Sequence, residues 1–296
     1  MTKLNEILKK HELTAHRYEK RGKSTIVDTD DGIYVYKKGH IDNKILTYLK
    51  SRNFDYIPEI LENDNYTLTR FIDDYDIPDE QKIIDLVKLT ALLHSKTTHY
   101  KEIDLDYYES IYDDLDNNLK YLYSYYTDLI TIIESKVFMS PSEGLLARNI
   151  SKIYDTISEN KKKLDSWHNL IKEKTKERNV ILHNNLKLEH FIRNNNSYLI
   201  SWDKSKIGSP IFDLYKLYQN HVLDFEFEDI FNTYEQIYPL TKDEKKLLDI
   251  LISMPDIIEL KDTEYNNCKN ISHSIDKIYK TEKIISPKTS EQGKEK

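Results

Sequence analysis

The sequence predicts an α+β fold in which a small antiparallel sheet comes first and a larger, mainly helical part follows. Residues 16–38 alternate apolar and polar side chains and contain an Asp-Asp-Gly sequence at 30–32 that favours a β-hairpin turn. Residues 81–98 place apolar side chains at the 3.6-residue spacing of an amphipathic helix. Residues 104–178 continue an almost uninterrupted helical pattern, which breaks at the Ser-Pro-Ser sequence at 140–142.

Composition narrows the class of protein. The chain has 296 residues, enough to bury a substantial core and to form one large or two medium domains. Its single cysteine, Cys268, excludes an internal disulfide and is typical of a reducing compartment. No apolar run reaches the roughly 18 residues that span a bilayer, and residues 1–10 lack the apolar centre of a signal peptide. We therefore expect a cytoplasmic protein without a membrane partner, and the net charge of −7 argues against nucleic acid as the main partner.

The N-terminal part is predicted to form two short helices and several strands. Residues 1–13 place three apolar side chains on one face, as an amphipathic helix does. Residues 33–38 and 66–72 alternate apolar and polar side chains, which is typical of strands buried on one side. Residues 42–51 predict a helix between these two strands.

The most informative stretch runs from Val180 to Leu217, where apolar segments alternate with polar loops and turns. Asn and Ser favour the backbone of a turn, and Gly followed by Pro marks a chain reversal. The segments predicted here are, in order, a buried strand at 180–182, a polar loop at 183–189, a short apolar segment at 191–192, a turn at 193–197, a return strand at 198–202, a turn at 208–210 and a helix at 212–218.

This order resembles the aminoglycoside phosphotransferase and choline kinase-like superfamily, which is related to the protein kinases and includes spore-coat proteins of the CotS type. Members carry a catalytic loop of the form H-x-D-x-x-x-x-N, a metal-binding Asp followed by Trp or Phe, and then G-x-P-x-x-D-L. Three segments of this chain match that frame without a gap: HNNLKLEH at 183–190, SWD at 201–203 and GSPIFDL at 208–214. Residues 89–94 are also similar to a family helix that ends in A-x-L-H.

The resemblance implies a two-lobed protein kinase-like fold. The N-lobe would comprise residues 1–75, with a small antiparallel sheet and a helix that cover a nucleotide. The large, mainly helical C-lobe would comprise residues 76–285, with the equivalent of the catalytic loop at 180–214. Residues 286–296 are polar and are expected to form a disordered tail.

Three positions that carry the chemistry of the family are changed. Asn185 stands at the position of the catalytic Asp, His190 at that of an Asn that holds a second magnesium, and Ser201 at that of the Asp that bridges magnesium to the nucleotide. An amide takes no proton at neutral pH, and imidazole is a poor ligand for magnesium. Phosphoryl transfer depends on positioning and charge neutralisation, so these changes predict a pseudokinase with lost or much reduced transfer.

Two retained positions are architectural in the family. Asp213 matches an Asp that hydrogen-bonds the backbone of the catalytic loop and holds it in place. The resemblance implies a similar structural part for His183.

The resemblance also assigns a nucleotide site, with ATP as the expected ligand. Lys37 matches the lysine that pairs with the phosphates, and the backbone of Arg70, Phe71 and Ile72 matches the hinge that holds adenine. The helix at 42–51 should offer a Glu to pair with this lysine, but its first residues are Asp and Asn.

Three functions stay open. The first is the pseudokinase, for which a magnesium requirement is not expected. The second is an active ATP-dependent phosphotransferase, acting on a hydroxyl of a small molecule, in which Asp203 and Glu189 rebuild the magnesium site. If the strand at 198–202 continued, Asp203 would share a face with Ser201 at roughly 6.5 Å along the chain. Otherwise both carboxylates are ordinary solvated loop charges. The third function is that of a structural protein of the spore-coat type. The partner beyond a nucleotide, whether a small molecule or a protein, is not specified by the sequence.

Overall fold

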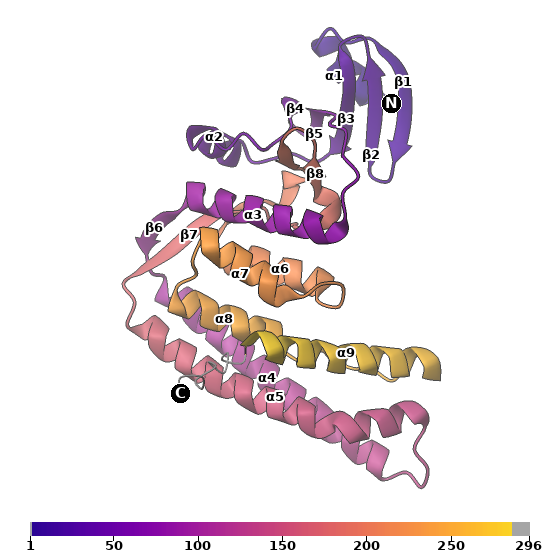
Figure 1. Ribbon diagram of the computed structural model, residues 1–296, viewed down its shortest axis with the longest axis vertical. Coiled ribbons are helices and arrows are strands. Elements are labelled where there is room, and N and C mark those ends of the chain that lie inside the picture. Colours follow the sequence, from indigo (N-terminus) through magenta and orange to yellow (C-terminus); the bar gives the residue numbers. More distant parts are fainter. Residues whose placement is uncertain (1, 286–296) are drawn as a thin grey trace, which may run out of the picture. The chain divides into compact units, whose positions relative to one another are not determined.

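The computed structural model of the protein describes residues 2–285, and Figure 1 labels its helices and strands. The contacts within the described chain group it into two compact units. Unit 1 contains residues up to 100, 178–217 and 232–239, and unit 2 contains the intervening residues and those from 240 onward. The predicted tail at 286–296 lies outside the described residues.

A five-stranded sheet dominates the N-terminal half of unit 1. Its strands are all antiparallel to their neighbours and lie in the order β1-β2-β3-β5-β4. Their bounds are β1 (Ala15–Arg21), β2 (Ser24–Thr29), β3 (Gly32–Lys38), β4 (Ile60–Asn63) and β5 (Tyr66–Arg70). This antiparallel sheet, followed by long helices, confirms the predicted α+β fold.

Two short helices accompany the sheet: α1 (Thr2–Lys10) and α2 (Asn43–Ser51). Helix α1 has one apolar face, and its buried Leu4 and Leu8 pack with Val27 and Leu68 of the sheet. Removing these apolar surfaces from water is what fixes such a short helix against the strands.

The β1–β2 turn is tight, because Arg21 pairs directly with Ser24. Gly22 in this turn has φ +57°, a left-handed conformation that side chains with a Cβ rarely adopt. Residues 22 and 23 therefore form a two-residue hairpin turn between β1 and β2.

The rest of unit 1 centres on the stretch that the sequence singled out. It contains α3 (Asp79–Thr97), the 3₁₀ turn η1 (Leu188–His190), β8 (Phe191–Arg193), β9 (Ser197–Leu199), the 3₁₀ turn η2 (Trp202–Lys204) and β10 (Lys206–Gly208). Strands β8 and β9 form a hairpin, and β10 pairs with β7 (Lys176–Leu182), which in turn neighbours β6 (His99–Glu102). Helix α6 (Ile211–His221) follows β10.

The predicted return strand at 198–202 is wrong at its C-terminal end. Strand β9 stops at Leu199, Ser201 adopts φ +66° and ψ +50°, and residues 202–204 form the turn η2. A left-handed residue cannot continue a strand. The bend lets the buried Trp202 ring pack edge-on against His183, at 4.8 Å between ring centroids, and donate its Nε1–H to the carbonyl of Leu199.

Unit 2 is built from long helices. They are α4 (Leu105–Glu134), α5 (Pro141–Lys172), α8 (Lys242–Ser253) and α9 (Glu264–Ile285), while α7 (Phe227–Ile237) divides between the two units. Helix α5 begins at a capping box in which Ser140 and Glu143 satisfy each other's backbone N–H groups. Helices α4 and α5 run side by side as a hairpin, and α5 also packs against α8 and α9 (Figure 1).

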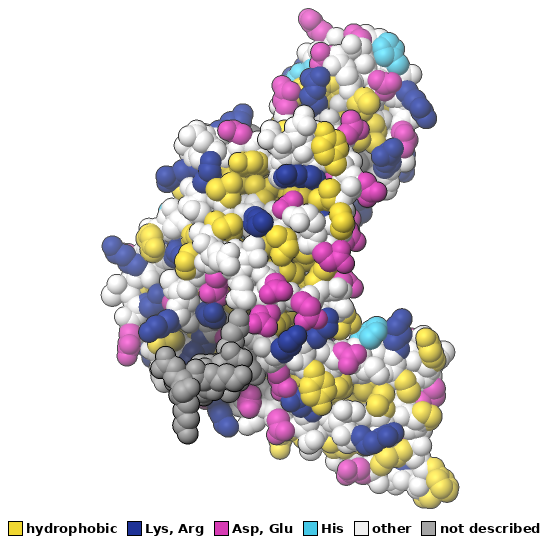
Figure 2. All heavy atoms as spheres, in the orientation of Figure 1, with side chains coloured by type: hydrophobic (Ala, Val, Ile, Leu, Met, Phe, Trp, Pro, Cys, Tyr) yellow, Lys and Arg dark blue, Asp and Glu magenta, His cyan; other side chains and the backbone are white. Residues whose placement is uncertain are grey.

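Charged side chains of both signs are interspersed over the face in view in Figure 2, rather than gathered by sign. None of the helices between residues 2 and 285 combines the length and the apolar character that a bilayer crossing requires.

Two glycines give opposite predictions for the same substitution. A Cβ at Gly208 would lie 2.9 Å from Cδ1 of Leu182, which is fully buried, whereas a Cβ at Gly144 in α5 would meet nothing within 4 Å. We expect Gly208→Ala to lower the free energy of unfolding by about 1–3 kcal/mol through overpacking. Gly144→Ala should raise it by about 0.5–1 kcal/mol, because alanine favours the helix. Urea unfolding of both variants measures the difference, and equal effects would contradict this packing.

Candidate functional site

A cavity of about 160 Å³ opens in unit 1 beside the sheet. Strand β3 contributes Val35 and Lys37 to its lining, and the hairpin β8–β9 and its continuation contribute Ile192, Ile200 and Ser201. Apolar walls that converge on a few polar groups are typical of a small-molecule site.

The segment that follows β5 forms one edge of this cavity with Arg70, Phe71 and Ile72, the three predicted hinge residues. The N–H of Phe71 donates to the carbonyl of Ile33 at 2.9 Å, so this N–H is already used within the sheet region. Among the predicted hinge amides, that of Arg70 is also bonded, to the carbonyl of Glu59 at 2.8 Å. A nucleotide base at this edge would therefore depend on the carbonyl groups and on the N–H of Ile72.

Hydrogen bonds join this edge to the β8–β9 hairpin. The N–H of Tyr75 donates to the carbonyl of Arg193 at 2.6 Å, and the N–H of Arg193 donates to Oδ1 of Asp74 at 2.7 Å. The side-chain amide of Asn194 donates to the carbonyl of Asp73 at 2.7 Å. These bonds fix the edge that carries the hinge residues relative to the hairpin that carries Ile192.

The polar end of the cavity is an ion pair. Nζ of Lys37 lies 2.8 Å from Oδ1 of Asp203 and 3.3 Å from Oγ of Ser201. Burial alone would raise the pKa of Asp203, but the hydrogen bond and the charge of Lys37 outweigh it and hold the pKa below its ordinary value. The two side chains are 25% and 31% exposed, so water screens the pair and its net stabilisation is small, about 1 kcal/mol or less.

The loop after β7 is held by a carboxylate from α6. Asp213 is fully buried; its Oδ2 accepts the backbone N–H of His183 at 2.8 Å, and its Oδ1 accepts that of Asn184 at 2.6 Å. Nε2 of the buried His94, on α3, also donates to Oδ2 at 3.2 Å, while Nδ1 of His94 bonds to the hydroxyl of Tyr234 at 2.6 Å. This carboxylate satisfies three donors at once, of which those of His183 and His94 are fully buried.

Lys216 completes this hold on the loop. It lies one turn after Asp213 on α6, and its Nζ donates to the carbonyl of Asn184 at 3.0 Å. Burial, followed by the charge of Lys204, lowers the pKa of Lys216. Asn184 itself has φ +57°, and its side-chain amide donates to the carbonyl of Lys204 at 2.9 Å. One helix thus binds both the N–H and the C=O groups of the loop.

Comparisons with known proteins identify the fold. No family model matches the sequence, and a search of curated proteins finds no match. Among solved structures, an aminoglycoside phosphotransferase from Alicyclobacillus acidocaldarius superposes with a TM-score of 0.66 at 9% identity, over 91% of this chain and 90% of that one. The AMP-bound complex of a spectinomycin phosphotransferase, APH(9)-Ia, gives 0.52 at 13% identity, over 97% and 95%.

The chain has the aminoglycoside phosphotransferase fold. The kinase-like fold predicted from the sequence is thereby confirmed.

Within this phosphotransferase fold, the three changed positions lie along one stretch of unit 1. Asn185 follows the loop residues that Asp213 holds, and its carbonyl accepts a hydrogen bond from Nδ1 of His190 at 2.7 Å. That bond assigns the ring proton to Nδ1 and leaves Nε2 of His190 as an acceptor. Ser201 lies at the polar end of the cavity, where its hydroxyl faces Lys37.

His183 is buried without a charge. Its Nε2–H donates to the carbonyl of Ile200 at 2.8 Å, and its Nδ1 has no partner among the described residues. Burial lowers its pKa to about 4, so the ring is neutral at pH 7. A neutral ring that ties the loop to residue 200 is a positioning element, because it exchanges no proton near neutral pH.

As the side chains are placed, the residues of this site do not offer a free set of ligands to a magnesium ion. Magnesium requires a near-octahedral set of oxygens and is usually held by one or two carboxylates together with phosphate. Asp203 is the carboxylate at the polar end, and it is bound to Lys37. Glu189 lies exposed on η1. Within residues 2–285, no three His, Cys, Asp or Glu side chains are placed to hold a metal ion together.

Asp42 and Asn43, which replace the expected glutamate, have other partners. Oδ1 of Asp42 accepts the N–H of Lys44 at 2.8 Å and caps α2. Oδ1 of Asn43 accepts a hydrogen bond from the side-chain amide of Asn63 at 2.8 Å. Asp203 is therefore the carboxylate that pairs with Lys37.

Two residues of the site have roles that the sequence does not predict. His94, near the end of α3, bonds to Asp213 across 119 positions of sequence. Lys216 was not singled out, although its spacing of three from Asp213 places both side chains on one face of α6. This spacing is the sequence feature from which the position of Lys216 beside Asp213 can be predicted. No local pattern in the sequence indicates the partner of His94.

The buried neutral His183 predicts a pH-dependent stability. In the unfolded chain histidine takes a proton below about pH 6.5, while the folded chain resists protonation until about pH 4. The unfolded state therefore binds more protons between these values, and the free energy of unfolding should fall by about 3 kcal/mol as the pH falls through this window. Urea unfolding at several pH values, compared with His183→Leu, isolates this contribution as the difference between the two slopes.

The matched control is His273→Leu, which removes an exposed histidine. Its pH profile should follow that of the unchanged chain. If His183→Leu also kept the full pH dependence, the burial of a neutral ring would not be its source.

Proposed function

We propose that this chain is a pseudokinase, which binds an adenine nucleotide in the cavity of unit 1 and does not transfer its phosphoryl group at an appreciable rate. The observation that carries the proposal is the ion pair between Lys37 and Asp203 beside Ser201. The ammonium of Lys37 is a cation that can bind phosphate. The carboxylate of Asp203 is already paired with it, so the polar end of the cavity offers no free carboxylate to a metal ion.

The chemistry of the cavity lining supports a nucleotide. Val35, Ile192 and Ile200 offer apolar surface to a flat base, and Lys37 offers its ammonium to phosphate oxygens. The spectinomycin phosphotransferase of the same fold is an AMP complex, which supports the same class of ligand for this chain. A phosphate group would compete with Asp203 for Lys37, and a partly exposed ion pair is weak enough to be displaced.

The side chains that usually support phosphoryl transfer are missing at three positions of this chain. Phosphoryl transfer needs an oriented acceptor and neutralisation of the charge on the transferred phosphate, which metal ions mainly supply. The amide at Asn185 cannot take a proton from the acceptor, and neither the imidazole at His190 nor the hydroxyl at Ser201 brings negative charge to magnesium.

One observation favours a second function, an active phosphotransferase. The left-handed Ser201 and the turn η2 bring the carboxylate of Asp203 to the polar end of the cavity, next to Ser201. In an active enzyme this carboxylate would leave Lys37 and bind magnesium with the nucleotide. Turnover of ATP that requires both magnesium and Asp203 would establish this second function.

Lys37→Met should weaken ATP binding about tenfold, because the loss of one charge-assisted contact to phosphate is worth about 1.4 kcal/mol. Isothermal titration calorimetry in the absence of divalent metal measures it. Lys20→Met, on the exposed surface of β1, is the control and should bind ATP as the unchanged chain does. Equal affinities of Lys37→Met and Lys20→Met would remove Lys37 from the site.

Asp203→Asn distinguishes the two functions by the sign of its effect. In the pseudokinase it removes a negative charge that competes with phosphate for Lys37, so metal-free ATP should bind about three- to tenfold more tightly. In the active enzyme it removes a metal ligand, so ATP with magnesium should bind more weakly. The control is Asp64→Asn, in the exposed turn between β4 and β5, which should leave both affinities unchanged.

A further inference from the structure

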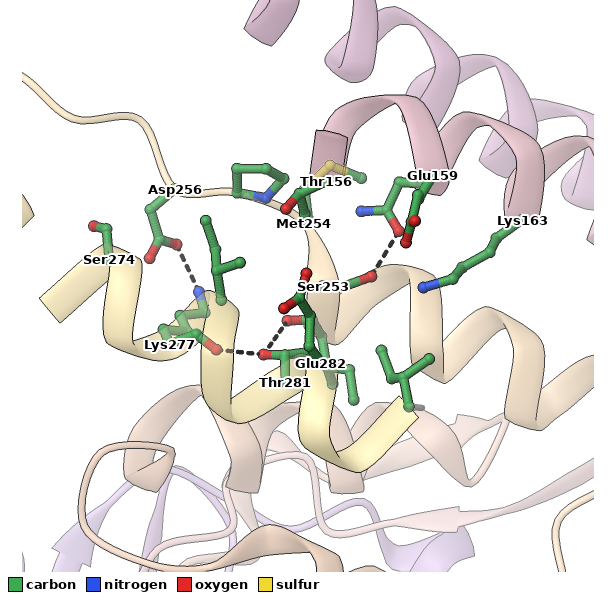
Figure 3. A pocket seen from close by; sticks show the side chains of 15 residues that line it. Thr156, Glu159, Lys163, Ser253, Met254, Asp256, Ser274, Lys277, Thr281 and Glu282 are labelled. Carbon is green, nitrogen blue, oxygen red and sulfur yellow. Dashed lines mark hydrogen bonds and ion pairs between the residues drawn. The ribbon is translucent and has the colours of Figure 1, made fainter. Parts of the chain in front are cut away.

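Unit 2 contains a second cavity, of about 350 Å³, which the proposed nucleotide site does not involve. Figure 3 shows the side chains that line it, which come from α5, from the end of α8 with the segment 254–256, and from α9. A volume of this size lies in the range of small-molecule sites.

Asn160 is a buried polar group of this cavity with a bonding capacity that the chain leaves unused. The residue is 0% exposed, and its Oδ1 accepts a hydrogen bond from Oγ of Ser253 at 2.6 Å. Its Nδ2 is buried and has no partner among the described residues. Because native proteins pair nearly all such donors, an oxygen atom of a ligand in the cavity is the natural partner of Nδ2.

The charged residues of the lining divide into paired and unpaired groups. Lys277 pairs with Asp256 at 2.6 Å, and Glu282 pairs with Lys152 at 2.5 Å. Lys163 and Glu159 have no ion pair among the interactions described for residues 2–285, although they lie one turn apart on α5. Figure 3 shows the side chain of Lys163 extending toward Ser253, the residue to which Asn160 is bonded.

The remaining wall is partly apolar, and Thr156, Ser274 and Thr281 add polar side chains to it. Met254, Pro255 and Ile278 line the cavity, and both Pro255 and Ile278 are buried. The cavity thus joins an unpaired ammonium and an unpaired amide N–H, a carboxylate close by along α5, and an aliphatic surface.

We propose that this cavity binds a small zwitterion with an aliphatic body, of the class of the apolar amino acids. The carboxylate of the ligand accepts hydrogen bonds from Nδ2 of Asn160 and from the ammonium of Lys163. Its amino group pairs with the carboxylate of Glu159, and its side chain packs on Met254 and Ile278. A simple anion would meet the charge of Glu159, and a simple cation would meet that of Lys163, so the zwitterion matches both.

The test is isothermal titration calorimetry of the full chain with L-leucine, isocaproate and isoamylamine as probes. Isocaproate lacks the amino group of leucine, and isoamylamine lacks its carboxylate. L-leucine should bind, and each of the other two probes should bind at least about tenfold more weakly, which corresponds to the loss of one charge-assisted contact. Absence of leucine binding, or equal binding of all three probes, would overturn the proposal.

Variants locate the binding in the cavity. Lys163→Met should weaken leucine binding about tenfold. Lys162→Met, which removes the exposed neighbouring lysine outside the lining, should have no effect. Asn160→Leu should also weaken binding; it removes the hydrogen bond with Ser253 together with the unpaired N–H, so its melting temperature is measured beside its affinity. Leucine binding that is identical in Lys163→Met and in the unchanged chain would place the ligand elsewhere.

All of these residues belong to unit 2, so the result of this test is independent of the nucleotide proposed for unit 1.

Discussion

The buried carboxylate of Asp213 is the interaction on which the loop after β7 depends. It accepts two backbone N–H groups of that loop and the ring N–H of His94; Asp213, His183 and His94 are fully buried, and Asn184 is half-buried. Without it, the two buried donors of His183 and His94 would be left unpaired, at a cost of about 1–3 kcal/mol each. Lys216 adds a donor from the same helix to a carbonyl of the loop. The loop therefore keeps its shape through contacts that involve no catalytic chemistry.

Under the proposed function, this framework keeps the loop in place although the chemistry of transfer is lost. The groups that shape the loop, His183 and Asp213, are held by burial and hydrogen bonding, so substitution there carries a large penalty in stability. The groups at the positions of catalysis, such as Asn185 and Ser201, are only half-buried, and replacement there leaves the core intact. Under the proposed function, Lys37 keeps its charge partner because Asp203 takes the place that a helix carboxylate would otherwise fill.

The sequence predicted the fold from patterns that extend over many residues. The alternation in β1 to β3 and the apolar period of α3 each repeat several times, so local exceptions do not change the outcome. The return strand at 198–202 failed because one residue, Ser201, turns to a left-handed conformation, and an apolar pattern does not register a single backbone angle. The same bend explains why Asp203 meets Lys37 from a 3₁₀ turn instead of from a strand. His94 and Asp213 are far apart in the chain, and so are the residues that line the cavity of unit 2. Neither arrangement can therefore be predicted from a spacing in the sequence.

Under the proposed function, the cavity of unit 1 binds a nucleotide without a divalent metal, because the carboxylate at its polar end, Asp203, is engaged by Lys37. The most direct measurement is the affinity of the unchanged chain for ATP, determined by calorimetry once with excess magnesium and once with a chelator. The two dissociation constants are expected to agree within about twofold. An affinity that is tenfold or more higher with magnesium would mean that Asp203 and its neighbours bind the metal with the nucleotide, and metal-free binding by a pseudokinase would then be wrong.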